Sequence, residues 1–568
     1  MKKRFVTVGF ILLWFGSVRA GEGLKPLAPD QWTRDHAAHL IRRAGFDDTP
    51  DNIDKIFKKG LDRAVDDLVD YEQFDPIDPD MERTALIDRN SMRGMRQLPD
   101  GARDLAQQAL RQTNNAYMQS VREWWIRRMV LTNRPLEEKM TLFWHGHFTS
   151  GYREVRSWAY MYDQNQLFRK HALGKLRPLL LDVSKDPAML IYLDGTRNRK
   201  GKPNENYARE LMELFTLGEG HYTETDIKEA ARALTGWRVT PATSDAAPAA
   251  QFIPRQHDDG EKTFLGRKGN LSLDDIVDIL LKQERTSRYM AERLIVFFVY
   301  PHPEPDIVTD LAAELRRTDY DLRATMRMLL KSEAFYSDKA RFARIKSPVE
   351  LVVGTYRSLG QSPGNPTVMA QATTRMGQEL FQPPNVKGWA GGRQWINTST
   401  LYQRYNVGQM ALAGVSEPAA NRSRANRMER TLALITGEET PTPEALAQAP
   451  EQRRHQMESM MMVAKDPAYD AMRKAFARIK PPPVWTRQTA AYDPIPTIRQ
   501  LHLQSFEQIA DHFADRLLHR KLTSAQQTIL IETVAPRGKS FNPNTSEAAT
   551  QVRRMMNLMM SMPEYQLN

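Results

Sequence analysis

Two segments of the 568-residue sequence concentrate side chains that can do chemistry. The first, residues 142–148, reads LFWHGHF and places His145 and His147 among aromatic residues. In a strand or an extended turn, residues two apart point the same way, so both imidazoles would be able to bind one metal ion. Gly146 between them gives the backbone freedom and lets a ligand approach closely. In a helix the two rings would instead diverge by about 200° and serve as hydrogen-bonded histidines under an aromatic cluster.

The second segment, residues 204–218, is predicted to be a helix with acidic side chains on one face. Arg209, Glu210 and Glu213 share one stripe at helical spacing. Two carboxylates one turn apart favour a positive charge between them, either an arginine or a metal ion. We therefore predict Glu210 and Glu213 as metal ligands or general base, with Arg209 stabilising developing negative charge. The alternative is a solvated face held by ion pairs of Arg209 with neighbouring glutamates.

These two segments together predict a metal-dependent, hydrolase-like enzyme of the cell envelope. In this hypothesis His145 and His147 bind a divalent metal ion, which activates water. The alternative function is a non-catalytic binding or assembly protein that pairs with a sulfatase-like protein or a surface glycan. The two hypotheses differ in geometry: convergence of His145, His147, Glu210 and Glu213 favours the enzyme, and their separation favours the binding protein.

Two further motifs are predicted to bind substrate. Residues 388–397 read GWAGGRQWIN, so Trp389 and Trp395 flank a flexible loop and are able to stack on the flat face of a sugar. Residues 257–263 read HDDGEKT, where His257 can supply a further ligand or help to bind an anion. The alternatives are a glycine-rich loop pinned to the core by its tryptophans and an ordinary hairpin turn.

The N-terminus predicts export. Residues 2–4 are basic, residues 5–15 are apolar but too few to span a bilayer, and VRA at residues 18–20 fits a signal peptidase site. We therefore expect a signal peptide over residues 1–20 and a periplasmic or secreted mature protein without a membrane span. An N-terminal membrane anchor is the alternative. The chain has no cysteine, which excludes disulfides, thiolate metal sites and a cysteine nucleophile.

The net charge suggests anionic partners other than nucleic acid. The formal charge is +11, and loss of the four basic residues of the signal peptide leaves +7. A basic surface favours acidic glycans or anionic head groups. Nucleic acid is excluded as a partner because the protein is exported and lacks a basic patch interleaved with aromatic residues.

Hydrophobic periodicity predicts a mainly α-helical protein with a small β-hairpin element near residues 237–270. We expect a helical core domain over residues 30–410, a linker over 411–450 and a C-terminal helical region over 451–568. A weak internal repeat relates residues 326–336 to residues 555–565, which suggests two related helical units or a chance likeness of amphipathic helices.

Five motifs spread along the chain resemble one bacterial family, the domain of unknown function eighteen-hundred. They are HLIRRAGF at residues 39–46, EKMTLFWHGHF at 138–148, NENYARELMELF at 204–215, ARALTGW at 231–237 and PNVKGW at 384–389. The resemblance covers nearly the whole mature chain. It implies an exported bacterial protein of a family whose members are often encoded beside a sulfatase-like family, and it transfers no catalytic residue.

Overall fold

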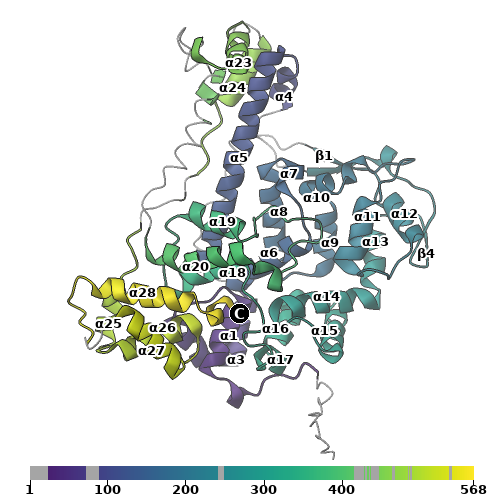
Figure 1. Cartoon of the computed structure of the whole chain (residues 1–568). Coiled ribbons are helices and arrows are strands. Elements are labelled where there is room, and N and C mark those ends of the chain that lie inside the picture. The colour runs from purple at the N-terminus through teal and green to yellow at the C-terminus, as the bar shows by residue number, and fades with distance from the viewer. Residues whose placement is uncertain are drawn as a thin grey trace, which may run out of the picture.

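The computed structural model describes most of the chain: residues 23–71, 89–240, 249–414, 447–462, 467–483, 489–535 and 540–568, with residues 428, 431–433, 435–436 and 485. The expected signal peptide and most of the expected linker lie outside these residues. Within them the protein is mainly α-helical, as the periodicity predicts (Figure 1).

The helices follow one another with short connections. The N-terminal half contains α1 (Arg34–Ala44), α2 (Pro50–Lys59), α3 (Leu61–Val69), α4 (Arg89–Met95), α5 (Asp100–Leu131), α6 (Pro135–His147), α7 (Tyr152–Val155), α8 (Trp158–Lys170), α9 (Leu176–Ser184), α10 (Pro187–Tyr192), α11 (Asn206–Glu210) and α12 (Glu224–Ala233). The middle contains α13 (Leu273–Leu281), α14 (Glu284–Phe298), α15 (Pro305–Arg317), α16 (Leu322–Leu330), α17 (Glu333–Tyr336), α18 (Pro348–Ser358), α19 (Pro366–Arg375) and α20 (Thr398–Leu412). The C-terminal part contains α23 (Glu451–Met462), α24 (Pro467–Phe476), α25 (Ile495–Gln500), α26 (Phe506–Leu518), α27 (Ser524–Val534) and α28 (Ala548–Met560).

Shorter turns of 3₁₀ helix join several of these elements. They are η1 (Pro29–Gln31), η3 (Gly195–Arg197), η5 (Pro254–Gln256), η6 (Gly392–Trp395) and η7 (Pro563–Gln566). One further element, η4 (Leu211–Thr216), is a π-helix that directly continues α11.

Local sequence explains many of the helix starts. The hydroxyl of Ser347 accepts the backbone N–H of Glu350, whose carboxylate accepts the N–H of Ser347 in return, and Pro348 occupies the first helical position of α18. Thr223 and Asp226 form the same reciprocal cap at the start of α12. Such caps satisfy N–H groups that the helix itself leaves unpaired.

The predicted β element is confirmed as two small antiparallel hairpins. β1 (Trp237–Thr240) pairs with β2 (Ala249–Phe252), with Trp237 opposite Phe252. β3 (Lys262–Phe264) pairs with β4 (Arg267–Gly269). Both hairpins lie within the expected residues 237–270 and follow α12 at one side of the molecule (Figure 1).

The longest helix, α5, extends away from the body of the molecule. Its far end carries α4, α23 and α24, so segments from both halves of the chain form a small helical group there (Figure 1). Its near end packs against α8, α18 and α19. Trp124 and Trp125, both fully buried, lie in this near part, where the core demands a continuous apolar surface.

Helix α6 lies at the centre of the body. Every residue of α6 except Gly146 is buried, including the charged Glu137, Glu138 and Lys139. The ammonium of Lys139 forms a buried ion pair with Glu350 and donates to the carbonyl of Gly45 at 3.0 Å. These contacts tie α6 to α18 and to the end of α1.

Two hydrophobic cores support the body. One contains residues of α1, α6, α9 and α13 to α17. The other contains residues of α5, α18, α19, α20, α26 and α28. The second core therefore joins residues on both sides of the expected linker, and the division into a core domain and a C-terminal region stays a prediction.

The two segments of the weak repeat adopt similar local structures. Residues 326–336 cover the end of α16 and α17, while residues 555–565 cover the end of α28 and most of η7. In each case a helix packed against two preceding helices ends in a short turn with a buried tyrosine, Tyr336 or Tyr565. The fold is therefore compatible with two related helical units.

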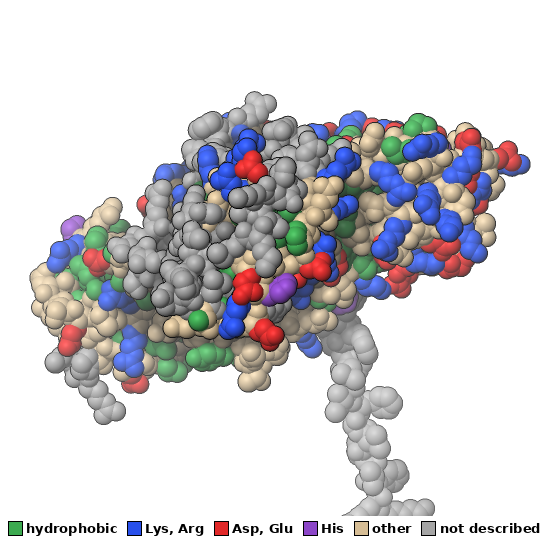
Figure 2. Space-filling model, turned by 90° about the horizontal axis from the view of Figure 1, so that it is seen from above, with side chains coloured by type: hydrophobic (Ala, Val, Ile, Leu, Met, Phe, Trp, Pro, Cys, Tyr) green, Lys and Arg blue, Asp and Glu red, His purple; other side chains and the backbone are tan. Residues whose placement is uncertain are grey.

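The surface seen from above carries both signs of charge. Figure 2 shows basic and acidic side chains interspersed on the lobe at the right of that view. Among the described residues, no helix combines the length and the apolar character that crossing a membrane requires.

Candidate functional site

His145 and His147 lie in the last turn of α6 and bond to different parts of the protein. The Nε2 atom of His145 accepts the backbone N–H of Phe381 at 3.0 Å. The Nε2 of His147 lies 3.1 Å from the carbonyl oxygen of Phe215, to which it donates. The extended arrangement that would align both rings on one metal ion is not formed, because the segment is helical and residues two apart diverge.

Both histidines are neutral at physiological pH. Each is buried, and burial lowers the pKa of each imidazole to about 3, with Arg293 adding to the effect on His147. His145 must carry its proton on Nδ1 because its Nε2 is an acceptor. The Nδ1 of His147 is buried without a hydrogen-bond partner. The aromatic surroundings expected from the sequence are present, with His145 between Trp125, Phe381 and Trp389.

The bond from His147 satisfies the backbone of the π-helix η4. A π-helix closes wider turns than an α-helix and shifts the phase of the side chains that follow. The carbonyls at its end accept from outside the helix: Tyr289 donates to Leu214 at 2.9 Å and Arg285 donates to Leu217 at 2.9 Å. His147 performs the same task for Phe215. His147 therefore contacts the acidic segment, but through the backbone carbonyl of Phe215 and not through a glutamate side chain.

Two of the three predicted catalytic residues of the acidic segment, Arg209 and Glu213, bond to different partners. Arg209 donates to both carboxylate oxygens of Glu224, at 2.9 and 3.0 Å, and lies 3.4 Å from Glu205. Glu213 accepts the hydroxyl of Tyr222 at 2.8 Å. Burial and the neighbouring Glu213 raise the pKa of Glu210 above its ordinary value. Arg209 therefore pairs with Glu205, as the alternative expects, and with Glu224 of α12, which the sequence did not predict as a partner.

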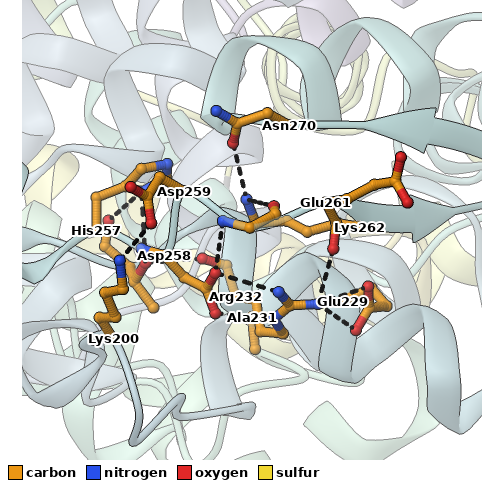
Figure 3. Close-up of polar contacts among 12 residues, drawn as sticks. Lys200, Glu229, Ala231, Arg232, His257, Asp258, Asp259, Glu261, Lys262 and Asn270 are labelled. Atoms are coloured by element: carbon orange, nitrogen blue, oxygen red, sulfur yellow. Dashed lines mark hydrogen bonds and ion pairs between the residues drawn. The ribbon is translucent and has the colours of Figure 1, made fainter.

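His257 lies in a different part of the fold, against Phe252 of β2 in the first hairpin. Its Nδ1 lies 3.1 Å from the carbonyl of Thr235. The following Asp258 forms a two-pronged ion pair with Arg232, at 2.8 and 3.1 Å, and Asp259 pairs with Lys200 (Figure 3). The carboxylates of the HDDG turn are thus used to join the turn to α12 and to the loop before α11.

Lys262 completes this network from inside. Its side chain is buried and donates to the carbonyl of Gly260 at 3.0 Å and to Asn270 at 3.3 Å (Figure 3). Arg232 also binds both oxygens of Glu229 at 3.0 Å. The charged side chains of this turn therefore bond to other groups of the protein.

Trp389 and Trp395 lie together on the wall of one pocket. The loop that carries them is fastened to the end of α6: the hydroxyl of Thr149 donates to the carbonyl of Val386 at 2.6 Å. Gly388 has a φ of +78°, and a Cβ atom on it would lie 2.5 Å from the carbonyl oxygen of Gly146. Only glycine fits this conformation and this approach.

The pocket has a volume of about 830 Å³ and is formed by segments far apart in the sequence. Its walls come from α6, from α14 with the turn that follows, from residues 343–350 and from residues 378–395. Gly146 forms part of the wall, and a side chain there would enter open space. A concave site of this size, lined by aromatic and a few polar side chains, is typical of ligand binding.

The charged groups of the pocket are mainly basic. Arg293, Arg344, Arg393 and His302 line it, with Glu350 as the carboxylate. Burial alone would raise the pKa of Glu350, but Lys139 and Arg344 hold it well below its usual range. Because Glu350 is paired with Lys139 and caps α18, it is not a free general base.

The predicted site residues therefore separate into four places, of which the acidic segment with Arg209, Glu210 and Glu213 is one. Trp389 and Trp395 share the pocket, His145 and His147 lie behind its wall with their Nε2 atoms on backbone groups, and His257 belongs to the hairpin network. Among the residues that the structure describes, no three His, Asp or Glu side chains gather closely enough to hold a metal ion. The donors present thus give no support to a joint metal site of the predicted histidines and glutamates.

Sequence reasoning missed the basic side of the pocket. Arg293, His302 and Arg344 lie in segments without motif character, and only folding brings them beside the glycine-rich loop. One signal was present in the sequence: Gly146 interrupts a run of large side chains, as a wall that must leave room for a ligand would require.

Comparison with known proteins identifies a family and nothing finer. Comparison with the curated proteins and with the solved structures gives no significant match. A family model described as "Protein of unknown function (DUF1800)" matches residues 39–567. This match includes α6, the π-helix, both hairpins and the tryptophan loop. The chain therefore belongs to the DUF1800 family.

Proposed function

We propose that this chain is an exported cell-envelope protein that binds a surface glycan without cleaving it. The observation that supports this function is the pocket of about 830 Å³ that Trp389 lines together with polar and basic side chains. Sugar rings combine an apolar face with a rim of hydroxyl groups. A half-buried indole beside hydrogen-bonding side chains suits both.

The two tryptophans have different tasks in this proposal. Trp395 is only 7% exposed, so it mainly anchors the loop, as one of the two alternatives expected. Trp389 is less buried and rests against His145, with ring centroids 5.5 Å apart. We assign ligand stacking to Trp389 and loop anchoring to Trp395.

The described pocket favours binding over hydrolysis. Hydrolysis of a glycosidic bond ordinarily needs two carboxyl groups that flank it. Glu350 is the carboxylate among the described residues of the wall, and it is held by Lys139. Glu210 and Glu213, the predicted catalytic acids, do not line this pocket.

A binding assay with matched variants tests the proposal. Purified mature chain is applied to a panel of immobilised bacterial and host glycans, and retained ligands are measured by titration. We expect Trp389→Ala to weaken binding at least tenfold, since base or ring stacking on an indole is worth about 1–3 kcal/mol. Trp237→Ala, in the β1 hairpin outside the pocket, should leave affinity unchanged.

Filling the pocket provides a second variant. Gly146→Leu projects into open space and should abolish retention while the protein stays folded. Retention that survives Gly146→Leu, or the absence of any retained glycan, would remove the proposed function. The sulfatase-like partner stays a prediction, and co-purification from cells that express both proteins checks it.

A further inference from the structure

The pocket contains arginines that form no direct ion pair within the described part of the chain. Among the described residues, no carboxylate lies within ion-pair distance of Arg293, Arg344 or Arg393. Elsewhere in the same region pairing is usual: Arg285 on α14 binds Glu292, and Arg357 on α18 binds Asp48. The unpaired guanidinium groups of Arg293, Arg344 and Arg393 therefore line one pocket.

Three N–H groups on the pocket-lining residues are buried and have no hydrogen-bond partner. They are the Nε of Arg293, the Nη1 of Arg344 and the Nε1 of Trp389. A buried donor without an acceptor costs about 1–3 kcal/mol, and native proteins leave few of them. All three belong to residues that line one cavity, so a side-chain rotation that turns these N–H groups toward the cavity would let a bound acceptor satisfy them.

The buried side chains behind the pocket also include several cations. Arg344 lies near the buried Lys139 and Arg43: after the effect of burial itself, Arg344 lowers the pKa of both, and Arg43 also lowers the pKa of Lys139. Glu350 is the carboxylate that faces this group. One acid does not balance the set, so a bound anion would relieve the repulsion between the cations.

We propose that the pocket binds an oxyanion, a carboxylate or sulfate group carried by an acidic saccharide, through Arg293 and Arg344. Guanidinium groups bind such oxyanions with two parallel hydrogen bonds. The Nε1 of Trp389 supplies a further donor, while the indole face packs on the ring that carries the charge. This inference rests on the proposed glycan-binding function and specifies the class of glycan.

The test compares saccharides of equal length and different charge. The mature chain is titrated with an oligogalacturonate, a sulfated galactan fragment and a neutral cello-oligosaccharide, each a tetrasaccharide, and with inorganic sulfate. We expect at least one acidic tetrasaccharide to bind about tenfold or more tighter than the neutral one. Affinity for it should fall as salt is raised from 50 to 300 mM, because the attraction is screened (about 10 Å Debye length at 0.1 M). The carboxylated and sulfated arms distinguish the two sources of the oxyanion.

Variants on one helix provide the matched control. Arg293→Gln removes a pocket guanidinium from α14 and should weaken acidic ligands about tenfold or more, with the neutral ligand unchanged. Arg288 lies on the same helix, does not line the pocket and donates to the hydroxyl of Thr309 at 3.1 Å. The Arg288→Gln variant should therefore bind acidic and neutral ligands as the wild type does. Arg344→Gln is expected to repeat the result of Arg293→Gln.

The outcomes separate this inference from the function on which it rests. Equal binding of neutral and acidic saccharides, unaffected by Arg293→Gln, would overturn the oxyanion site and leave the glycan-binding function standing. Stabilisation by inorganic sulfate that depends on Arg293, without retention of any saccharide, would support the oxyanion site and overturn the glycan-binding function. Absence of binding by sulfate and by every saccharide would overturn both.

Discussion

At the scale of single residues, the His-Gly-His motif is explained by three different tasks. His145 accepts the N–H of Phe381, His147 donates to the carbonyl of Phe215, and Gly146 leaves space for the pocket and for Gly388. Each histidine joins α6 to a segment more than sixty positions away in the chain. The motif therefore joins the end of α6 to the segments that contain Phe381, Phe215 and Gly388, beside the pocket.

The histidines should make the protein sensitive to acid. Their folded pKa of about 3 lies below the ordinary value of 6.5, so the folded state binds fewer protons between these values. Stability is then complete above pH 6.5 and falls as pH drops, by up to about 1.4 kcal/mol per pH unit for each histidine. The His145→Gln/His147→Gln variant, whose amides can replace both Nε2 bonds, should show a shallower loss in urea unfolding between pH 7 and pH 4.5.

The difference in pH dependence of stability between the wild type and the double histidine variant isolates the contribution of the two histidines. Asp186, whose pKa burial raises to about 7, acts in the opposite direction, because its protonated folded form is lost as pH rises. It does so equally in both proteins and cancels in the comparison. Parallel stability curves for wild type and variant would contradict buried neutral imidazoles.

The two glycines that meet at the pocket should respond in opposite ways to the same substitution. Gly388→Ala combines a φ of +78° with a Cβ atom 2.5 Å from a carbonyl oxygen. We expect it to lower the free energy of unfolding by about 2 kcal/mol or more. Gly146→Ala meets open space in a helix and should be neutral or stabilise by up to about 1 kcal/mol. Urea denaturation of both variants checks this contrast, and similar effects would show that the loop does not pack on α6 as described.

At the scale of elements, the buried ion pair between α6 and α18 fixes the two helices that carry the pocket. Lys139 comes from α6 and Glu350 from the first turn of α18, where the same carboxylate also caps the helix. Burial lowers the pKa of Lys139 to about 8, although Glu350 opposes this effect. Glu350 therefore favours the charged form of the buried lysine.

Removal of the negative charge of Glu350 should lower the free energy of unfolding. Glu350→Gln leaves Lys139 as a buried cation without a counter-charge, and we expect a loss of about 3–5 kcal/mol in the free energy of unfolding. The Lys139→Met/Glu350→Gln double variant removes both charges and should recover part of this loss. Thermal and urea unfolding measure both effects. A loss below about 1 kcal/mol in the single variant would contradict the role of the pair.

At the scale of the whole molecule, the second hydrophobic core joins the C-terminal helices to the body. Phe513 of α26 and Met556 of α28 are fully buried in the same core as Val352 of α18. The chain also pairs Ile345, beside Arg344, with Leu567 in an isolated antiparallel bridge. The C-terminal segment therefore supports the loop that carries one of the pocket arginines.

This arrangement predicts coupled unfolding across the expected linker. Phe513→Ala should destabilise the protein by about 3–5 kcal/mol through the cavity that it leaves. Trp485 is the one tryptophan of the sequence that follows the expected linker, so tryptophan fluorescence reports mainly on the residues before the linker. We expect the fluorescence midpoint in urea to shift with the C-terminal substitution. An unchanged fluorescence transition, with a separate early transition in far-UV circular dichroism, would instead indicate independent domains.

The sequence by itself determined the helical class, the hairpins and the position of the tryptophan loop. These features depend on local pattern: hydrophobic spacing sets the helix faces, and residues 237–270 mix turn formers with β formers. It also placed Trp389 and His145 in motifs that prove to be in contact. Local pattern was sufficient wherever a feature is formed by neighbours in the chain.

Only the tertiary structure decided which chemical groups meet. The sequence suggested that His147 and Glu213 approach each other, but the π-helix changes the phase of its side chains and offers His147 a carbonyl instead. The arginines of the pocket come from α14 and from the loop before α18, and no spacing in the sequence relates them to Trp389. Charge pairing is a property of distance in space, so whether an arginine is neutralised by the protein or left for a ligand appears only after folding.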